Sequence, residues 1–444
     1  MTDHTISRPN AHSPIEASPH RPDAYRRAVG AARACIASLA LIAVASTLLS
    51  CGRAKKTDIA IIWTDQADFA SYVELFNKSQ TRYRAIVEYR ENPAGALIAA
   101  KETPDIVIGP WLKGEKARSR LIPVDYLFNE LRISAKLFYG PLLGLGNVGG
   151  RQYLLPVSFN MPVLIFSPEK RNLVPNDFSL SLDEIKSIAR EYNLKHKGQF
   201  VRMGFSPRWD REFLYVTAQL FEARFEEDSR VIKWDADSLD AAERYLSDWT
   251  KTSNGSSRAE DDFQFKYLYD PPYRLVTGGR NLFSCISSDE LFTLPQDKLQ
   301  NLDFRWITKN GKAAVTDGIT YLGICKKAPN IDAAEAFLIW FFNEKTQKEL
   351  LERSRDLGSL KRSFGISGGF SALKSVNEKA FPLLYPPLLG HLPPANSLLV
   401  PRILPNNWEI IKRELVVPYL ADAVSDDGSK SSLRDRITDW TKAH

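Results

Sequence analysis

The segment that decides the fold runs from Asp58 to Tyr89 and reads DIAIIWTDQADFASYVELFNKSQTRYRAIVEY. Its opening residues, DIAIIW, form an apolar run of strand length. Large apolar residues then recur at positions i, i+3, i+4 and i+7, which predicts an amphipathic helix over 66–79. Alternating residues over 83–89 predict a second strand. The helical positions are Phe69, Tyr72, Val73 and Phe76.

The alternation of strand and helix continues beyond this segment. An alanine-rich stretch over 94–101 predicts a helix, and PDIVIG at 104–109 predicts another buried strand. Strands and helices that alternate in this way are typical of a parallel sheet with covering helices. We further predict a Gly149-Gly150 hairpin over 148–153 and a mostly helical middle over 180–249. Two more strands are predicted over 282–286 and 319–325, and a helical C-terminal part over 332–440. The chain is therefore expected to be an α/β protein.

The composition is that of an ordinary globular protein. The 444 residues contain 44% hydrophobic and 25% charged residues, which excludes wholesale disorder, and the length suggests more than one compact unit. The 59 Lys and Arg against 53 Asp and Glu give a net charge of +6. This mild surplus does not imply a nucleic-acid partner, and we expect none.

Residues 1–50 have the pattern of an export signal. Several arginines precede an apolar run over 34–49, which at about 16 residues is shorter than the roughly 20 needed to span a bilayer. The run ends in Leu-Leu-Ser-Cys-Gly, which resembles the lipobox of bacterial lipoproteins, in which the cysteine is acylated after cleavage. Cys51 is thus the predicted lipidation site, and 51–57 a short tether. A plain secretory signal or a buried N-terminal helix are the alternatives.

Motifs for catalysis or cofactor binding lack their structural context. The G-x-G-x-x-G pattern at 144–149 precedes a predicted strand, whereas a dinucleotide site needs a helix there. The G-x-S-x-G pattern at 365–369 leaves a serine hydrolase using Ser367 as an alternative, although no buried strand precedes it. The histidines after residue 57 are not paired at ligand spacing. We therefore expect no catalytic residue, no metal and no cofactor.

The placement of tryptophan suggests a binding site. Trp63 ends the first strand and Trp111 follows the PDIVIG strand, and loops at the carboxyl ends of parallel strands form the binding crevice. Trp209 lies in a loop-like stretch and Trp408 opens a helix. Aromatic faces stack on sugar rings, and polar residues near them can bind hydroxyl groups. The polar candidates are Asp65, Asn160, Asp210 and Ser287.

Two cysteines lie in the predicted globular part. Cys285 and Cys325 each fall in an apolar, strand-like run. An exported protein can form disulfides, so pairing stays open, but buried free thiols fit the apolar surroundings better.

Several stretches, in their order along the chain, resemble one protein family. They are 59–89, TPDIVIG at 103–109, GRQYLLPVSFNMPVLIF at 150–166, DGITYLGICKKAPNIDAAEAFLIWFF at 317–342, and the closing helices over 400–443. Together they resemble family 1 extracellular solute-binding proteins, the maltose-binding-like receptors of ABC importers. The chain departs from the family at Asp317-Gly318, where a glycine pair is expected, and at 282–286.

The resemblance implies an α/β, two-lobed, periplasmic-binding-protein-like (type II) fold with a hinge and an interlobe ligand cleft. Lobe 1 would comprise 58–158 and 318–365, and lobe 2 would comprise 159–317 and 366–444. The implied ligand is a small solute, first of all a carbohydrate. The ligand-binding residues carried over are Trp63, Asp65, Trp111, Asn160, Trp209, Ser287 and Trp408.

The resemblance also implies partners and a location. A monomeric receptor of this kind would deliver its solute to ABC permease subunits from the extracytoplasmic side, in the periplasm or at the cell surface. The N-terminal lipid would hold it to the membrane. The alternative is a surface lipoprotein that keeps the fold but acts as an adhesion or interaction module.

Overall fold

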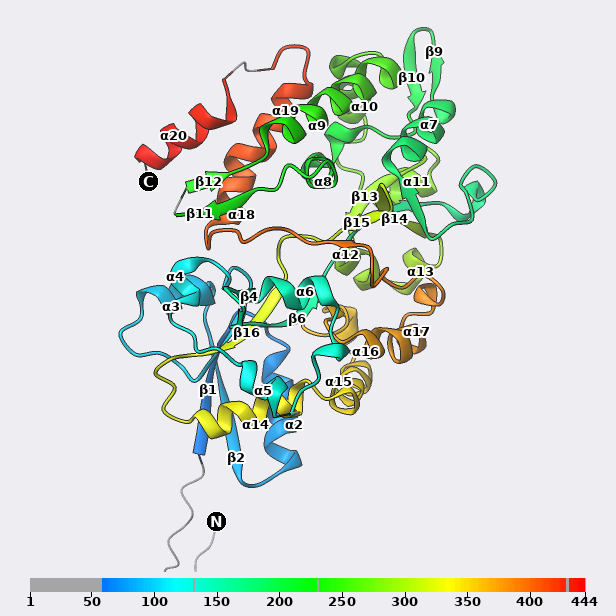
Figure 1. The fold of residues 1–444 in the computed structure, drawn as a ribbon. Coiled ribbons are helices and arrows are strands. Elements are labelled where there is room, and N and C mark those ends of the chain that lie inside the picture. The colour runs from blue at the N-terminus through cyan, green and yellow to red at the C-terminus, as the bar shows by residue number, and fades with distance from the viewer. Residues whose placement is uncertain (1–57, 131, 230, 429–430, 444) are drawn as a thin grey trace, which may run out of the picture. The chain divides into compact units, whose positions relative to one another are not determined.

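Two β-sheets, each covered by helices, organise the residues that the computed structural model describes (Figure 1). These residues are 58–130, 132–229, 231–428 and 431–443. The predicted export signal, the lipidation site Cys51 and the tether lie outside them. None of the helices in the described ranges is long and apolar enough to cross a membrane.

The first sheet has the strand order β17-β6-β16-β3-β1-β2. Its β1 pairs in parallel with both β2 and β3, which confirms the parallel arrangement predicted from the alternation of strands and helices. The other pairs, β16 with β3 and β6, and β17 with β6, are antiparallel, so the complete sheet is mixed. The strands are β1 (Asp58–Thr64), β2 (Tyr83–Tyr89), β3 (Ile106–Gly109), β6 (Leu155–Phe159), β16 (Thr320–Ile324) and β17 (Phe370–Ser371).

The predicted amphipathic helix is α2 (Phe69–Ser79), which begins three residues later than the range predicted. Its four predicted apolar positions are all buried. They pack against α14 (Ile331–Phe341), where the rings of Phe76 and Phe337 meet edge to face with centroids 5.3 Å apart. The helical spacing of large apolar residues therefore predicted the packed face correctly.

The aspartate of the PDIVIG segment, Asp105, has a structural role in the first lobe. Asp105 is fully buried, and its carboxylate accepts hydrogen bonds from the backbone N–H groups of Ile61 (2.8 Å) and Asn330 (2.7 Å). It thereby ties β1 to the start of α14. Charge-assisted bonds to backbone donors satisfy a group that would otherwise be costly to bury.

The second sheet has the strand order β13-β7-β14-β15-β18, with β8 paired to β14. It is mainly antiparallel, and only the pairs β14–β8 and β15–β18 are parallel. Its strands are β7 (Pro162–Phe166), β8 (Ser179–Ser181), β13 (Ser284–Ser287), β14 (Asp303–Lys309), β15 (Lys312–Ala314) and β18 (Leu398–Leu399).

Each sheet and the helices that pack around it form one lobe. Those of the first lobe are α2, α3 (Pro93–Ala99), α4 (Glu115–Arg118), α5 (Asp125–Asn129), α6 (Gly140–Leu145), α14, α15 (Glu344–Asp356), α16 (Lys374–Lys379) and α17 (Phe381–Leu384). Those of the second are α7 (Leu182–Tyr192), α8 (Arg211–Leu220), α9 (Ala236–Trp249), α10 (Ser257–Phe265), α11 (Pro272–Thr277), α12 (Ser288–Thr293), α13 (Gln296–Leu299), α18 (Trp408–Ile411), α19 (Val417–Val424) and α20 (Leu433–Ala443).

Three short hairpins lie outside the two sheets. They are β4 (Asn147–Val148) with β5 (Arg151–Gln152), β9 (Leu194–His196) with β10 (Gln199–Arg202), and β11 (Glu226–Asp228) with β12 (Val231–Lys233). Gly149 and Gly150 form the predicted tight turn, with φ angles of 60° and 77°. Glycine adopts this left-handed region without a steric penalty.

The chain crosses between the sheets three times, from β6 to β7, from β15 to β16, and through 385–397 to β18. The first two crossings are joined, because Asn160 O accepts hydrogen bonds from the N–H and the Oγ1 of Thr316 (2.9 and 3.1 Å). This arrangement confirms two α/β lobes with crossing segments. The predicted boundary between the lobes at 365 differs from the structure, because β17 pairs with β6 and this pairing keeps 370–371 in the first sheet.

The two cysteines of the described chain lie in different sheets. Cys285 is on β13 and Cys325 directly follows β16, and both are buried free thiols. They do not pair.

Candidate functional site

A pocket of about 370 Å³ lies where the two lobes meet, and we call it the interlobe pocket. The first lobe contributes Trp111, and the second contributes Arg211 and Glu212 from the start of α8. The crossing segment contributes Asp317, and the C-terminal helices contribute Lys412. Ligand pockets of proteins commonly occur at such junctions between lobes.

The backbone at Trp111 is strained. Trp111 has a φ of 63°, in the left-handed region that bulky side chains rarely adopt. Its side chain is 9% exposed and lines the interlobe pocket just beyond the carboxyl end of β3. Strain of this kind costs on the order of 1–3 kcal/mol and is found most often at ligand clamps and active sites.

Asp317 is the centre of a buried polar network beside this pocket. The residue is 2% exposed, and its carboxylate accepts hydrogen bonds from Trp408 Nε1 (2.8 Å), Gln219 Nε2 (2.9 Å) and the Tyr215 hydroxyl (3.2 Å). Lys412 Nζ lies 3.4 Å from the same carboxylate. The crossing segment is thus held to α8 and to the C-terminal helices.

Lys412 connects this network to Glu212. Its Nζ donates to both carboxylate oxygens of Glu212, at 3.0 and 3.1 Å. Burial opposes the charged form of Lys412, but the nearby Asp317 and Glu212 carboxylates raise its pKa above the ordinary value. Lys412 begins a π-helical turn over Lys412–Val416, a kind of irregularity often found at functional sites.

The charges around the interlobe pocket are balanced. Three basic and three acidic side chains line it: Arg211, Lys412, Arg413, Glu212, Asp317 and Glu409. Such a set offers both charge-assisted donors and acceptors beside the aromatic Trp111. Neither sign of charge predominates in the lining of this pocket.

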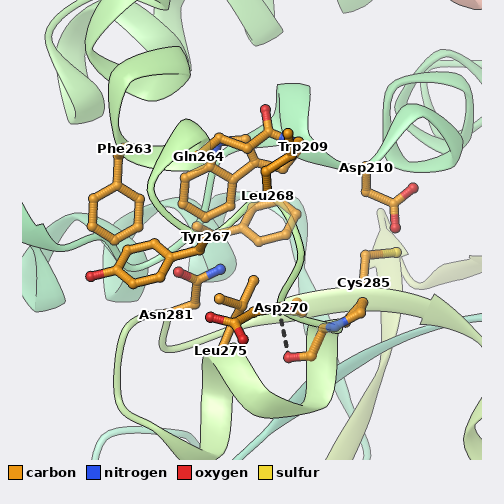
Figure 2. A pocket seen from close by; sticks show the side chains of 13 residues that line it. Trp209, Asp210, Phe263, Gln264, Tyr267, Leu268, Asp270, Leu275, Asn281 and Cys285 are labelled. Carbon is orange, nitrogen blue, oxygen red and sulfur yellow. Dashed lines mark hydrogen bonds between the residues drawn. The ribbon is translucent and has the colours of Figure 1, made fainter.

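A second hollow of about 150 Å³ lies within the second lobe, and we call it the second-lobe pocket (Figure 2). Trp209, Phe263 and Tyr267 line it. The rings of Trp209 and Phe263 are stacked with centroids 5.4 Å apart, and Phe263 meets Tyr267 at 5.2 Å. The pocket therefore has a largely aromatic wall.

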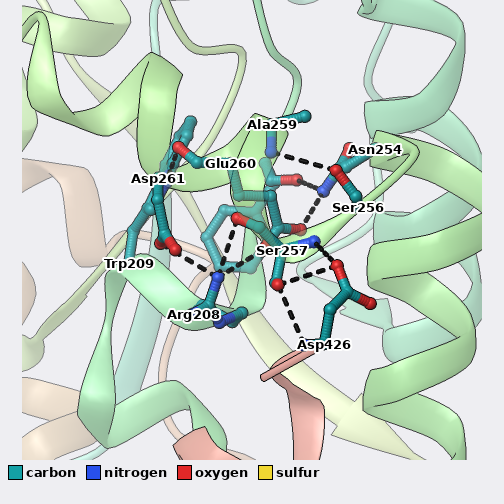
Figure 3. A network of polar contacts seen from close by, with 10 residues as sticks. Arg208, Trp209, Asn254, Ser256, Ser257, Ala259, Glu260, Asp261 and Asp426 are labelled. Atoms are coloured by element: carbon teal, nitrogen blue, oxygen red, sulfur yellow. Dashed lines mark hydrogen bonds and ion pairs between the residues drawn. The ribbon is translucent and has the colours of Figure 1, made fainter. Parts of the chain in front are cut away.

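The loop that carries Trp209 is anchored to α10 (Figure 3). Trp209 Nε1 donates to Glu260 O (3.4 Å), and Arg208 Nη1 donates to Ser257 O and Asp261 Oδ1 (both 2.9 Å). The start of α10 is tied in turn to the C-terminal segment by Asp426, whose carboxylate accepts from the Ser257 hydroxyl (2.9 Å). These contacts hold the aromatic wall in place.

Two polar side chains of the second-lobe pocket lack a partner of their own kind: Asp210 has no counter-ion and Asn281 has no hydrogen bond among the described residues. Asp210 Oδ1 caps α8 by accepting the N–H groups of Glu212 (2.8 Å) and Phe213 (3.2 Å), and burial raises the pKa of Asp210 to about 6. Asn281 is 2% exposed, and neither atom of its amide has a hydrogen-bond partner among the described residues.

Two of the predicted ligand-binding tryptophans line these pockets, Trp111 the interlobe pocket and Trp209 the second-lobe pocket. Trp408 is fully buried and reaches the interlobe network through its bond to Asp317. Asn160 lies at the first crossing, where Nδ2 donates to Gly368 O (2.8 Å) and Oδ1 accepts from the Ser288 hydroxyl (2.7 Å). These contacts join the two lobes.

The other predicted residues line neither pocket. Trp63 Nε1 donates to Glu88 (2.9 Å), and the Arg90 guanidinium lies 4.6 Å from the centre of its ring. Asp65 accepts from Gln66 Nε2 (2.8 Å), and partial burial raises its pKa. The Ser287 hydroxyl caps α12 in a reciprocal arrangement with Glu290.

Sequence reasoning missed the charged residues of the interlobe pocket. Lys412 follows Trp408 by four residues, so helical spacing places the two on one face, and this spacing could have indicated it. Arg211 and Glu212 begin a helix that Asp210 caps, which marks a helix start but not a ligand contact. No local pattern indicated Asn281 or Tyr267.

Ser367 lacks the surroundings of a nucleophile. It is 3% exposed, and its hydroxyl lies 3.3 Å from Gln66 Oε1 as a hydrogen-bond donor. The loop that carries it leads into strand β17, whereas a nucleophile elbow leads into a helix. Among the described residues there is also no group of three or more His, Cys, Asp or Glu side chains that could hold a metal ion.

Comparison with known proteins gives matches among solved structures. No family model matches the chain, and no curated protein matches it. The sugar-binding protein MalE from Xanthomonas citri is 13% identical with a TM-score of 0.64, over 87% of this chain and 96% of that one. An ABC substrate-binding protein from Listeria monocytogenes, solved with cycloalternan, is 14% identical with a TM-score of 0.59, over 87% and 99%.

A third structure agrees with these two. The cyclic α-maltosyl-1,6-maltose binding protein from Arthrobacter globiformis is 17% identical with a TM-score of 0.57, over 87% of this chain and 98% of that one. At identities this low, the matches establish a shared fold and nothing more specific. The chain has the two-lobed α/β fold of MalE-like ABC sugar-binding proteins, as the sequence resemblance predicted.

Proposed function

We propose that this protein is a lipid-anchored, extracytoplasmic solute-binding receptor that delivers a carbohydrate to an ABC importer. One observation carries the proposal: both lobes and a crossing segment contribute side chains to a single pocket. A pocket built in this way changes shape when the lobes rotate about the crossings, so closure can trap a solute.

The lining of the interlobe pocket supports a carbohydrate ligand. Its balanced charges suit hydroxyl groups, and the strained Trp111 offers an aromatic surface for a sugar ring. Among the predicted ligand-binding residues, we propose Trp111 and Trp209 as direct contacts. Asn160 and Trp408 would act as positioning residues, because their polar atoms hold the crossing segments.

The anchor and the partners are proposed from the sequence. Acylation of Cys51 would hold the protein to a membrane on its extracytoplasmic side, where permease subunits of the importer could meet the ligand-bound lobes. Incorporation of labelled palmitate into the wild-type protein, and its loss in Cys51→Ser, would support this part of the proposal.

The ligand-binding part can be tested by isothermal titration calorimetry and thermal shift with a panel of oligosaccharides. At least one should bind and raise the melting temperature, since a ligand that binds only the folded state stabilises it. Trp111→Ala should abolish the shift. Trp234→Ala, which removes a half-buried tryptophan beside Phe225, is the matched control and should leave it intact.

If no oligosaccharide binds the purified protein, the receptor function is contradicted, and the interaction-module alternative gains support. Binding that survives Trp111→Ala would instead show that the ligand lies outside the interlobe pocket.

A further inference from the structure

We propose that the second-lobe pocket binds a basic amino group, so that the carbohydrate ligand is an amino sugar or contains one. This inference rests on the proposed carbohydrate-binding function and narrows its ligand class. It is carried by the charge, the aromatic wall and the unpartnered amide of that pocket.

The charge of the pocket is negative. Of the thirteen residues that line it, Asp210 and Asp270 are the charged ones. Two basic side chains neighbour its lining from outside: Arg274 is 4.0 Å from Asp270 with both side chains exposed, and the Arg280 guanidinium is 5.6 Å from the centre of the Tyr267 ring. The lining thus favours a ligand group with a positive charge.

Asp210 is the strongest element of this charge. It is partly buried, and in the described part of the chain no basic group forms an ion pair with it. Its Oδ1 receives only the two N–H groups at the start of α8, and the Cys285 thiol, a weak donor, contacts the same carboxylate. Partial burial of a carboxylate without a counter-ion carries a desolvation cost, and a ligand cation would reduce that cost.

The aromatic wall suits the same group. Trp209, Phe263 and Tyr267 present π-systems to the pocket, and the negative face of an aromatic ring attracts an ammonium group. The same faces can stack on the apolar face of a sugar ring. At about 150 Å³ the pocket has the volume of a cavity that accepts one six-membered ring.

Asn281 supplies an independent observation that a ligand belongs here. Figure 2 shows Asn281 among the side chains that line the pocket. The residue is 2% exposed, and both Nδ2 and Oδ1 lack a partner in the described chain. Buried amides are nearly always hydrogen-bonded. An amino sugar offers both complements: its ammonium group donates to Oδ1, and a hydroxyl accepts from Nδ2.

The inference is tested with pairs of sugars that differ only in one group. Calorimetry at about pH 7 would compare glucosamine with glucose and galactosamine with galactose, as free sugars and as β-1,4-linked disaccharides. We expect the amino sugar of at least one pair to bind about tenfold more tightly than its hydroxyl counterpart, because a charge-assisted bond replaces a neutral one.

Substitutions test which carboxylates cause the preference for amino sugars. Asp210→Asn keeps the acceptor that caps α8 and removes the charge, so it should abolish the preference for the amine. Asp270→Asn should reduce the preference partly. Asp262→Asn, on the exposed side of α10 and outside the pocket, is the control and should bind like the wild type.

The outcomes separate the two proposals. If neutral sugars bind as tightly as their amino counterparts, or if the folded Asp210→Asn variant keeps the preference, the amino-sugar inference is overturned and the carbohydrate receptor stands. If no sugar of either class binds, including the neutral oligosaccharides, both proposals are overturned.

Discussion

Trp408 Nε1 donates a hydrogen bond of 2.8 Å to Oδ2 of Asp317, and both side chains are buried. The two residues are 91 positions apart, one on a C-terminal helix and the other in a crossing between the lobes. The same carboxylate receives Gln219 and Tyr215 from α8. The second crossing is therefore fixed to the second lobe, so its freedom to bend lies on the side of β16.

Asp317→Ala should strongly destabilise the protein. The substitution leaves the donors of Trp408, Tyr215 and Gln219 without their acceptor and leaves Glu212 as the carboxylate that pairs with Lys412, and breaking a buried charged pair on one side costs about 3–5 kcal/mol. Urea denaturation followed by tryptophan fluorescence would measure the loss. Glu349→Ala, at an exposed position of α15, is the control and should change the free energy of unfolding by less than about 0.5 kcal/mol. A loss from Asp317→Ala no larger than this would contradict the network.

Lys113→Met should stabilise the protein at neutral pH. Lys113 is 1% exposed, its Nζ has no hydrogen-bond partner within the described residues, and it lies 4.9 Å from the centre of the Tyr321 ring. Burial lowers the pKa of Lys113 to about 8, although Asp317 acts in the opposite direction. Below that pH the folded protein carries a buried charge, so its removal should add about 1–3 kcal/mol to the free energy of unfolding.

The pH dependence of this gain has a definite sign. Because the folded-state pKa lies below the unfolded value, the wild type should regain stability as the pH rises from about 8 toward 10. The difference between wild type and Lys113→Met should shrink over that range. Lys116→Met, at an exposed position of α4, should show neither effect. A loss of stability in Lys113→Met at neutral pH would mean that the ammonium group has a bound partner.

Glu260→Gln should remove a different pH dependence. Glu260 is fully buried, Asn254 Nδ2 donates to its Oε1 (2.6 Å), and Arg208 is no closer than 4.0 Å (Figure 3). Burial raises the pKa of Glu260 to about 7. The folded protein therefore holds a proton that the unfolded chain releases near the ordinary carboxyl pKa, so stability falls as the pH rises from about 5 to 7.

The glutamine variant keeps the acceptor for Asn254 and carries no charge. Its melting temperature should fall less than that of the wild type over this pH range, and above about pH 7 it should be more stable than the wild type by about 3 kcal/mol at most. Asp261→Asn, an exposed neighbour on α10, should follow the wild-type profile. Parallel profiles for wild type and Glu260→Gln would show that Glu260 does not titrate in this range.

Local patterns predicted the parts of the fold that depend on local spacing. The apolar positions of α2 and the glycine turn between β4 and β5 follow from helical period and from turn chemistry. The order of short motifs along the chain predicted two lobes. The boundary at 365 differed from the structure because β17 is a two-residue strand whose place depends on pairing with β6, and no local pattern encodes that contact.

The site could be predicted only in part, because its residues also depend on contacts between segments that are distant in the sequence. The rule for strand ends placed Trp111 at a pocket, but it could not tell on which face of β1 the Trp63 ring lies, where Glu88 and Arg90 hold it. Trp408 was expected to face a ligand, yet its indole turns toward Asp317, an acceptor that is distant in sequence. Asn281 and Asp270 become pocket residues only when α11 and β13 come together in the fold.

The positive φ of Trp111 allows backbone strain and ligand binding to be separated by two substitutions at one position. Ala at a φ of 63° keeps a Cβ in the left-handed region, which costs roughly 1–2 kcal/mol, whereas Gly adopts this conformation freely. Both substitutions remove the same indole from the interlobe pocket, so the loss of packing is common to them.

Trp111→Gly should therefore be more stable than Trp111→Ala by about 1 kcal/mol, which reverses the order expected at an ordinary position, where glycine is the more costly residue. Both variants should lose the sugar-induced thermal shift equally, because binding depends on the indole and not on the backbone. Urea denaturation measures the first effect and calorimetry the second. An alanine variant as stable as the glycine variant would show that the backbone relaxes out of the strained conformation once the indole is gone, and the strain would then be a consequence of how Trp111 is held in the pocket.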